Sequence, residues 1–265
     1  MNVDLTLLDL LLILGVSGLV TVVAFVHRPR VKALVFSFPV PFILANLALG
    51  EPIGASHAAG LLNLLLFLNL VRWLHRNARV PVVATIAISA AVYIGIGAGL
   101  NQLIPNTPLA FWAGFAVVLL AAGTLLATMA ARVEPGHRTE LPVALKFLAV
   151  SGVVTVVVLL KNILGGFMTT FPLAGVVTVY ETRKSLWTLS RQAPLLVLAI
   201  ATMMMVMRLC QQQADMSVPL SLLPGVGAWL AIIIPFTIVR FKREDRLDRE
   251  DPSEGKPTRE PQVSP

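Results

Sequence analysis

Two stretches of this sequence carry the same interruption: "LVFSFPVPFILAN" (Leu34–Asn46) and "GGFMTTFPLAGVV" (Gly165–Val177). In each stretch a Phe-Pro pair stands in the middle of an apolar run. A proline inside a helix removes one backbone hydrogen bond and clashes with the preceding turn. Two such breaks at matching places predict a shared architectural role, and the surrounding composition indicates the class of protein that contains them.

The composition is that of a membrane protein. Hydrophobic residues make up 56% of the 265 residues and charged residues only 13%, whereas a soluble domain has about 25% charged residues. The charges are clustered, and the stretches between them are apolar over lengths that read as membrane-spanning helices. A single cysteine, Cys210, excludes an intramolecular disulfide and any multi-cysteine metal site.

We expect an all-α polytopic membrane protein with about nine transmembrane helices. Several of the predicted spans are shorter than the roughly 20 residues that an upright helix needs, notably the second, seventh and eighth. The predicted spans are Leu5–Val26, Ala33–Leu49, Ala55–Leu74, Val80–Leu100, Leu109–Ala131, Leu141–Leu160, Leu164–Tyr180, Pro194–Leu209 and Val218–Val239.

Lysine and arginine predict the orientation, because they gather in cytoplasmic loops. With the N-terminus outside and the C-terminus inside, the inside loops hold twelve of the 21 basic residues and the tail holds seven more. Only Lys161 and Arg208 fall outside. The tail, residues 241–265, is rich in charge, proline, serine and glycine, so we expect it to be disordered.

An internal repeat accompanies the two Phe-Pro pairs. "VSGLVTVVAF" (Val16–Phe25) matches "VSGVVTVVVL" (Val150–Leu159) at an offset of 134 residues, and the two Phe-Pro pairs are 133 residues apart. The predicted units are residues 1–104, a linking helix with its inside loop at 105–140, and residues 141–240. With one helix between two four-helix units, the second unit is inverted relative to the first. This 4+1+4 inverted-topology repeat is a plan used by secondary transporters, whose sites lie at the repeat interface on discontinuous helices.

The two prolines mark the predicted site. Each frees a backbone carbonyl near the middle of the membrane, which neighbours, hydroxyls or a water-filled cavity must satisfy. The alternative interpretation is a pair of kinked packing helices, since proline is common in membrane helices. The predicted substrate-binding residues are Ser37, Phe38, Pro39, Thr169, Thr170, Phe171, Pro172 and Lys161.

Three ionisable residues near span ends are further candidates, because charged groups are costly inside a bilayer. Lys161 either extends to the membrane surface or offers a positive site to an anion. Asp9 is either an acid favoured by the dipole at a helix N-terminus or a weak candidate for ion coupling, and Glu181 is either a local ion-pair partner or a second coupling candidate. His57 is expected at the membrane interface, and Asn63 and Asn69 are expected to form hydrogen bonds between helices.

The segment "LKNILGGFMTTFPLAGVVTVYET" resembles the small GlpM-type bacterial membrane proteins, in which a lysine near the end of the first helix precedes glycine-rich residues and then a Phe-Pro or Leu-Pro in the second. Here Lys161, Gly165, Gly166, Phe171 and Pro172 occupy those places. The resemblance covers Leu141 to about Arg240, and more faintly Leu5 to about Leu100. In the first half His27 replaces the lysine, and charged residues replace the glycines. The resemblance implies a fused, duplicated form of such a unit in a bacterial inner membrane, and it implies no reaction.

The leading functional prediction is a small-solute secondary transporter or permease whose site lies at the two Phe-Pro breaks. An anionic or neutral solute is slightly favoured, and a proton or sodium gradient would supply the energy. The alternative is a non-transporting membrane scaffold or assembly partner. No nucleotide-binding, zinc-protease or nucleophile-elbow motif occurs, so we expect no enzyme, no catalytic residues, no metal and no cofactor. The expected partners are the lipid bilayer and the small solute, with no nucleic acid, and both a monomer and a homo-oligomer fit the sequence.

Overall fold

The computed structural model describes residues 6–25, 38–129, 142–183 and 186–250, and every regular element within them is a helix. The predicted site residue Ser37, the predicted first inside loop at 27–32 and residues 251–265 of the tail lie outside the described residues. The helices are α1 (Leu7–Phe25), α3 (Val40–Leu49), α4 (Ala55–Arg76), α5 (Val82–Leu103), α6 (Pro108–Thr128), α7 (Val143–Leu159), α8 (Lys161–Leu164), α9 (Gly166–Thr170), α10 (Leu173–Glu181), α11 (Leu186–Gln213) and α12 (Val218–Glu250).

Five of these helices are long and apolar enough to cross a membrane: α4, α5, α6, α11 and the Val218–Phe236 part of α12. Shorter apolar helical stretches occur at Leu7–Leu19, Val40–Leu49 and Phe147–Leu159. Lengths of 19 to 28 residues match the roughly 20 residues that span a bilayer at 1.5 Å per residue. The protein is therefore a multi-pass helical membrane protein.

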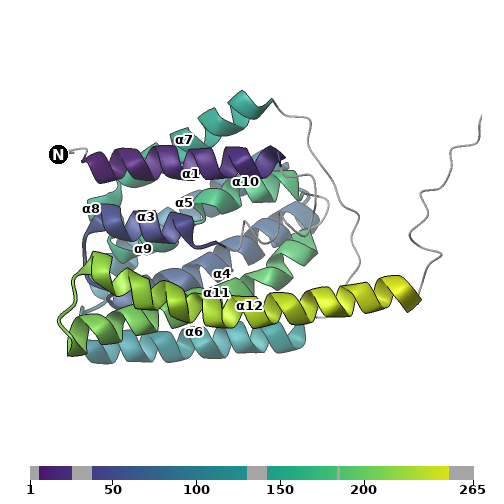
Figure 1. Ribbon diagram of the computed structural model, residues 1–265. Helices are drawn as coiled ribbons and strands as arrows, with labels where there is room; N and C mark the ends of the chain where they lie inside the picture. Colours follow the sequence, from purple (N-terminus) through teal and green to yellow (C-terminus); the bar gives the residue numbers. More distant parts are fainter. Residues whose placement is uncertain (1–5, 26–37, 130–141, 184–185, 251–265) are drawn as a thin grey trace, which may run out of the picture.

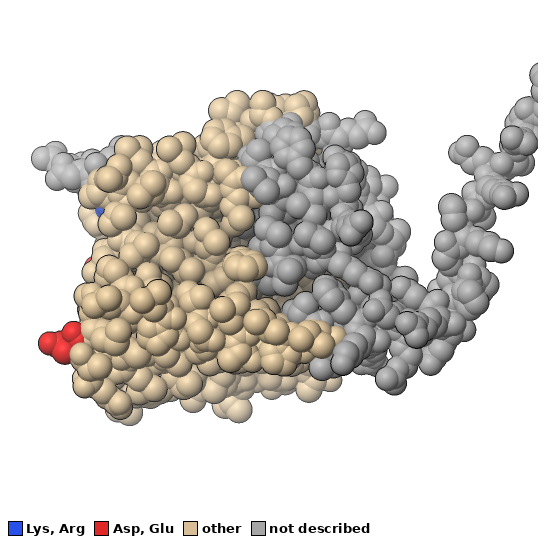
Figure 2. Space-filling model, viewed as in Figure 1, with Lys and Arg blue, Asp and Glu red and all other residues tan. Residues whose placement is uncertain are grey.

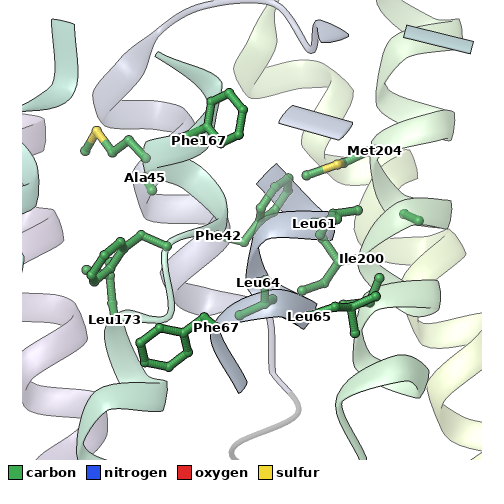
Figure 3. Close-up of a cluster of buried hydrophobic side chains, with 14 of the residues drawn as sticks. Phe42, Ala45, Leu61, Leu64, Leu65, Phe67, Phe167, Leu173, Ile200 and Met204 are labelled. Atoms are coloured by element: carbon green, nitrogen blue, oxygen red, sulfur yellow. The ribbon is translucent and has the colours of Figure 1, made fainter. Parts of the chain in front are cut away.

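The helices lie roughly side by side, and α4 occupies the centre (Figure 1). It packs against α5, α6, α9 and α11, while α11 packs along α12. On the other side α1 packs against both α3 and α7. Buried side chains from α3, α4, α9, α10 and α11 converge in one cluster, in which Phe42, Phe167 and Met204 are prominent (Figure 3).

The outer surface fits a lipid environment. Over the described residues, the face in Figure 2 is almost entirely uncharged. Large apolar side chains are exposed on several helices, including Leu109 at 80%, Leu120 at 71% and Leu223 at 73%. In water such continuous apolar exposure would be an interaction surface; on these long helices it is the surface that contacts lipid tails.

Local sequence explains several helix ends. The hydroxyl of Thr107 accepts the backbone N–H of Ala110 at 3.3 Å, and Pro108 follows it at the first helical position of α6. At α1, the Asp9 carboxylate accepts both the backbone N–H and the hydroxyl of Thr6 at 2.9 Å, while the Asp9 N–H donates back to that hydroxyl. These reciprocal bonds satisfy N–H groups that have no partner within the helix.

Two predicted boundaries at the C-terminal end of the chain are wrong. α11 begins at Leu186 rather than Pro194, so this proline lies buried inside a continuous helix. α12 continues to Glu250, so residues 241–250 are helical rather than disordered. The sequence places opposite charges four residues apart, Asp245 with Arg249 and Arg246 with Glu250, which favours a helix even without an apolar face.

Candidate functional site

The predicted seventh span, Leu164–Tyr180, is not one helix: it runs from the last residue of α8 through α9 into α10. α8, α9 and α10 follow α7 and are separated at Gly165 and at Phe171-Pro172. Gly165 has φ 51° and ψ −132°, a backbone conformation that residues with a Cβ adopt only under strain. A Cβ at Gly165 would also lie 2.5 Å from the side-chain oxygen of Asn101 on α5. A glycine is therefore required at this first break.

The second break follows from the missing N–H of Pro172. Without that donor the carbonyl of Met168 would lose its helical partner, and the Phe171 N–H bonds to it at 3.2 Å instead. This shift to a tighter turn leaves the carbonyl of Phe167 without the N–H that would reach it in a regular α-helix. Pro172 itself is the N-cap of α10. The predicted interruption at this proline is confirmed.

Helix α5 supplies the donors that the broken segment lacks. The Tyr93 hydroxyl donates to the Phe167 carbonyl at 2.9 Å, and the Thr170 hydroxyl lies 2.9 Å from the same tyrosine oxygen. Eight residues further along α5, the Asn101 side-chain amide donates to the Ile163 carbonyl of α8 at 3.1 Å. Freed carbonyls in a membrane must find such partners, and here two side chains of one helix provide them.

The hydroxyls predicted to line a substrate site are engaged inside the protein. Thr169 donates to the Gly166 carbonyl at 2.8 Å, and Thr170 is held by the Tyr93 network. Thr169 is 2% exposed, Thr170 5% and Phe171 4%. The ring of Phe171 meets Tyr93 edge-on, with centroids 5.0 Å apart. The Pro172 break is thus a packed, dry region in this conformation.

Glycines on the neighbouring helices allow α9 to approach closely. A Cβ at Gly60 of α4 would lie 2.1 Å from the Thr170 hydroxyl oxygen, and one at Gly97 of α5 would lie 3.2 Å from Phe167. On α9 itself, a Cβ at Gly166 would lie 2.4 Å from the Nδ1 atom of His57 and 2.6 Å from the His57 backbone nitrogen. Small residues at helix interfaces are a general means of close packing in membranes.

The first Phe-Pro pair begins α3. Pro39 is the N-cap of this helix, and its carbonyl accepts the N–H of Ile43 at 2.8 Å. Phe38 is 45% exposed, and its ring centroid lies 5.4 Å from that of Trp229 on α12. α3 packs against α9. The structure therefore places the helix that Pro39 begins beside the segment that precedes Pro172.

Lys161 and Asp9, predicted as separate candidates, form one ion pair. The Lys161 Nζ donates to the Asp9 Oδ2 at 2.6 Å, with the lysine side chain 14% exposed and the aspartate fully buried. The pair joins the start of α1 to the start of α8. The other oxygen of Asp9, Oδ1, is buried with no hydrogen-bond partner. Because Lys161 already carries a carboxylate partner, its charge is largely neutralised as a site for an anion.

Glu181 stands apart from these residues. It is 4% exposed at the last position of α10. Lys161, with its partner Asp9, lies at the opposite end of the α8–α10 segment. Nearby, the Arg183 guanidinium lies over the Tyr180 ring, 5.2 Å from its centroid. The structure does not bring the two predicted coupling acids together.

Sequence reasoning missed three residues of this region. Tyr93 and Asn101 were not singled out, although each is an isolated polar side chain in or beside an apolar span. His57, expected at the interface, is only 1% exposed, because its Nδ1 accepts the Gly54 N–H at 3.1 Å and α9 packs over it. Asn63 does bond between helices, to the Tyr93 carbonyl, whereas Asn69 bonds within its own helix to Leu65.

The segment before α4 is hydrogen-bonded to α11, at the end of the molecule where α4 begins. Arg208 donates to the Ile53 carbonyl, and Gln211 accepts the Ile53 N–H at 2.9 Å. The Arg208 guanidinium also lies over the Phe111 ring, 5.4 Å from its centroid. Arg208 therefore links α11 to α6 and to the segment that precedes α4.

Within the described ranges, no group of three histidine, cysteine, aspartate or glutamate side chains could hold a metal ion. Comparison with known proteins gives no family model, no curated protein and no solved structure that matches this chain.

Proposed function

We propose that this multi-pass membrane protein is a small-solute secondary transporter built from two inverted repeats. The observation that carries the proposal is a contact between equivalent positions. Ser17 and Ser151 are 134 residues apart, the offset at which the sequence repeats, and their hydroxyl oxygens lie 2.9 Å apart. Two copies of one unit bring an identical position against itself only on their common two-fold axis.

The packing of the helices supports the same axis. α1 lies beside α7 and the two run in opposite directions (Figure 1). The contacts of the first unit recur in the second: α1 with α3 corresponds to α7 with α10, and α4 with α5 corresponds to α11 with α12. Contacts between the units recur as well, since α3 with α12 corresponds to α5 with α10. α6, the odd helix, packs against both α4 and α11.

The proposed repeat has nine crossings of the membrane. α1, α3, α4, α5 and α6 would be the first five, and α7, the broken α8–α10 segment, α11 and α12 the last four. The part of the predicted second span before Phe38 lies outside the described ranges. The N-terminus would then lie outside and the C-terminus inside, as the basic residues predict.

The proposed substrate site lies where α3, α9 and α10 meet. Inverted-repeat transporters place substrate on discontinuous helices at the repeat interface, and α3 of one unit contacts α9 of the other. The pairing of Lys161 with Asp9 leaves a neutral solute favoured over an anion. A proton or sodium gradient would drive transport. We further propose a bacterial inner membrane location, kinship with the GlpM-type proteins, and no enzymatic activity.

A second candidate function rests on a specific observation. The Pro172 break is dry and its polar groups are bonded internally, which is the arrangement expected of a non-transporting scaffold or assembly partner. A transporter would have to open this region by moving α9 away from Tyr93. The two functions therefore differ in one measurable property, the access of water to the break.

Cysteine accessibility measures that property. Cys210 would be replaced by serine, and single cysteines placed at Thr169 and at Thr170 in the full chain. Intact cells would be treated with a membrane-permeant and with an impermeant maleimide. Labelling of either position supports the transporter, because a buried, dry thiol reacts slowly with these reagents.

Two loop positions provide matched controls. Glu51 and Ala78 are both exposed, at opposite ends of α4. With the proposed orientation, a cysteine at Glu51 reacts with the impermeant reagent in intact cells, and one at Ala78 reacts only after permeabilisation. If neither threonine position is labelled while both controls react as stated, the proposed central site is excluded and the scaffold is favoured.

A further inference from the structure

His57 is a buried histidine near the start of α4, and its hydrogen bond allows only one protonation state. The residue is 1% exposed. Its Nδ1 accepts the backbone N–H of Gly54, the N-cap residue of α4, at 3.1 Å. A ring nitrogen that accepts a hydrogen bond carries no proton, so the imidazole is neutral and its one proton is on Nε2.

The second ring nitrogen of His57 lacks a partner. Nε2 is buried and forms no hydrogen bond within the part of the chain that the structure describes. A buried donor in this state is unfavourable, because it has given up its bonds to water without replacing them. A conformation that lets water reach Nε2 recovers this loss. The imidazole therefore favours a loosening of the packing around it.

The short helix α9 covers the imidazole. A Cβ at Gly166 would lie 2.4 Å from the Nδ1 atom of His57, and a Cβ at Gly60, three residues further along α4, would lie 2.1 Å from the Thr170 hydroxyl oxygen. α9 therefore lies along α4 from His57 to Gly60. This is the segment that must move if water is to reach the Pro172 break.

A proton on Nδ1 is incompatible with this packing. An imidazolium donates from both nitrogens, so the Nδ1–H group would face the Gly54 N–H across 3.1 Å. The attraction between these two groups would become a repulsion between two donors. Because Gly166 packs against the same nitrogen, the ring can turn away from Gly54 only if α9 moves.

The charged and titratable groups around His57 do not stabilise an imidazolium. α4 packs against α5, α6, α9 and α11, and none of these helices, nor α4 itself, contains an acidic residue. α6 and α9 have no titratable side chain, and α5 contributes only Tyr93. At this end α11 contributes Cys210 and Arg208, whose guanidinium donates to the Ile53 carbonyl next to Gly54. A second positive charge here meets repulsion and no carboxylate.

We propose that His57 is the binding site of the coupling proton, and that its protonation releases α9 from α4. The proposal rests on the proposed transporter function and names its driving ion. In the conformation described here the ring is neutral and covered. When α9 moves away, water reaches the ring, Nε2 gains a partner, and Nδ1 takes up a proton from the water. A proton that binds only the open conformation shifts the population toward it.

The test measures access to α9 as a function of pH. Full-length protein carrying Cys210→Ser and Thr170→Cys would be reconstituted in lipid nanodiscs, so that both membrane faces meet the same buffer, and its rate of reaction with an impermeant maleimide would be measured. Division by the rate at Glu51→Cys, an exposed position, corrects for the pH dependence of the thiol itself.

The expected size of the effect follows from the titration of a hydrated histidine. Such a histidine has a pKa of about 6.5. If only the open conformation binds the proton, the ratio of open to closed protein rises about thirtyfold between about pH 8 and about pH 5. The corrected labelling rate is expected to rise with it. A corrected rate that does not rise with acid would overturn the proposal.

His57→Asn is the decisive variant. Its side-chain oxygen can still accept the Gly54 N–H but cannot take up a proton, so its corrected labelling rate is expected to be low and independent of pH. Circular dichroism checks the fold, and His57→Gln, which also lacks a titrating group, replaces this variant if it unfolds. A rise with acid that persists without the imidazole would overturn the proposal.

His75→Asn is the matched control, because His75 is the other histidine of α4. Its Nδ1 lies 2.9 Å from the Val80 carbonyl. A carbonyl only accepts, so this Nδ1 already carries a proton, and protonation of the ring keeps the bond. The variant is expected to retain the rise of the wild type. Loss of the rise in His75→Asn would place the proton site at the other end of α4 and would overturn the role of His57.

The outcomes also separate this proposal from the transporter itself. Labelling of Thr170→Cys at a corrected rate that is the same at every pH leaves the transporter in place and overturns the role of His57. An absence of labelling at any pH, while Glu51→Cys reacts, overturns both, because water then never reaches the break.

Discussion

The two Phe-Pro pairs have the same sequence signature and very different surroundings. Phe171 is 4% exposed and meets Tyr93 edge-on, whereas Phe38 is 45% exposed and contacts Trp229 from the surface. Both prolines cap the helix that follows. The proline thus determines where a helix starts, but the neighbouring helices determine whether the break becomes part of the core. Substitutions in and around the two Phe-Pro pairs would test this conclusion.

The largest effect is expected at Gly166, which has no glycine counterpart in the first half. Gly166→Ala would place a Cβ within 2.6 Å of the His57 backbone nitrogen, an atom that cannot move aside without shifting α4. We expect a loss of about 3 kcal/mol in the free energy of unfolding. Thermal unfolding in detergent, followed by circular dichroism, measures it.

The control for this variant is Gly99→Ala. Gly99 is in the interior of α5, and nothing lies within 4 Å of an added Cβ. Here we expect a gain of about 0.5–1 kcal/mol, because alanine restricts the unfolded chain more than glycine does. A similar result for the two variants would mean that α9 does not pack against α4 as described.

The next effect compares the two phenylalanines directly. Phe171→Ala opens a cavity beside Tyr93 of α5, and we expect it to cost about 3 kcal/mol. Phe38→Ala removes only a surface ring contact with Trp229, and we expect about 1 kcal/mol. The same unfolding measurement applies to both. Equal losses would contradict the difference in burial on which the comparison rests.

The Asp9–Lys161 pair is a third point of difference, because the proposed repeat would place Val143 and His27 at the corresponding positions of the other half. Asp9→Asn leaves Lys161 without its carboxylate in a largely buried position, and we expect a loss of about 2 kcal/mol. Lys161→Met alone should cost a similar amount. The double variant Asp9→Asn/Lys161→Met should lose less than the sum, with a coupling of at least about 1 kcal/mol, if the pair is formed. Strictly additive losses would show that the two residues do not interact.

The smallest effect is expected at the hydroxyl that supports the break. Tyr93→Phe leaves the Phe167 carbonyl with only the longer bond from the Thr170 hydroxyl, at 3.3 Å, so we expect a loss of about 1 kcal/mol. The matched control is Tyr180→Phe, the only other tyrosine in the chain, whose ring keeps its contact with Arg183. It should change stability by less than about 0.5 kcal/mol. The proposed network would be refuted by a larger effect at Tyr180 than at Tyr93.

Much of the helical organisation could be predicted from the sequence, since the position and length of an apolar run follow directly from the thickness of the bilayer. α4, α5 and α6 begin and end within a few residues of their predicted bounds. The break at Pro172 was also predictable, because the missing N–H is a property of proline itself. The long α12 was not, since its charged end has no apolar pattern, and only the spacing of opposite charges in the sequence favours a helix there.

The candidate site was predicted less completely, because its partners come from distant parts of the chain. Lys161 and Asp9 were each recognised as unusual, yet nothing in the sequence indicates that residues 152 positions apart form a pair. Tyr93 and Asn101 gave no pattern at all, because one hydroxyl and one amide on α5 acquire a role only when α8 and α9 lie opposite them. His57 was expected at the interface, because nothing in the sequence indicates that α9 packs over it and buries it.

The sequence by itself determined that this is a multi-pass helical membrane protein and where a proline interrupts its helices, and it contains the similar segments, 134 residues apart, on which the proposed repeat rests. These properties are local: they depend on runs of apolar residues, on proline, and on the order of residues along the chain. Only the tertiary structure decided which break is buried, which charges neutralise each other, and which side chains satisfy the freed carbonyls. Those outcomes depend on contacts between helices far apart in sequence, and in a membrane such contacts are selected by close packing and hydrogen bonding rather than by hydrophobicity, because lipid and protein interior are equally apolar.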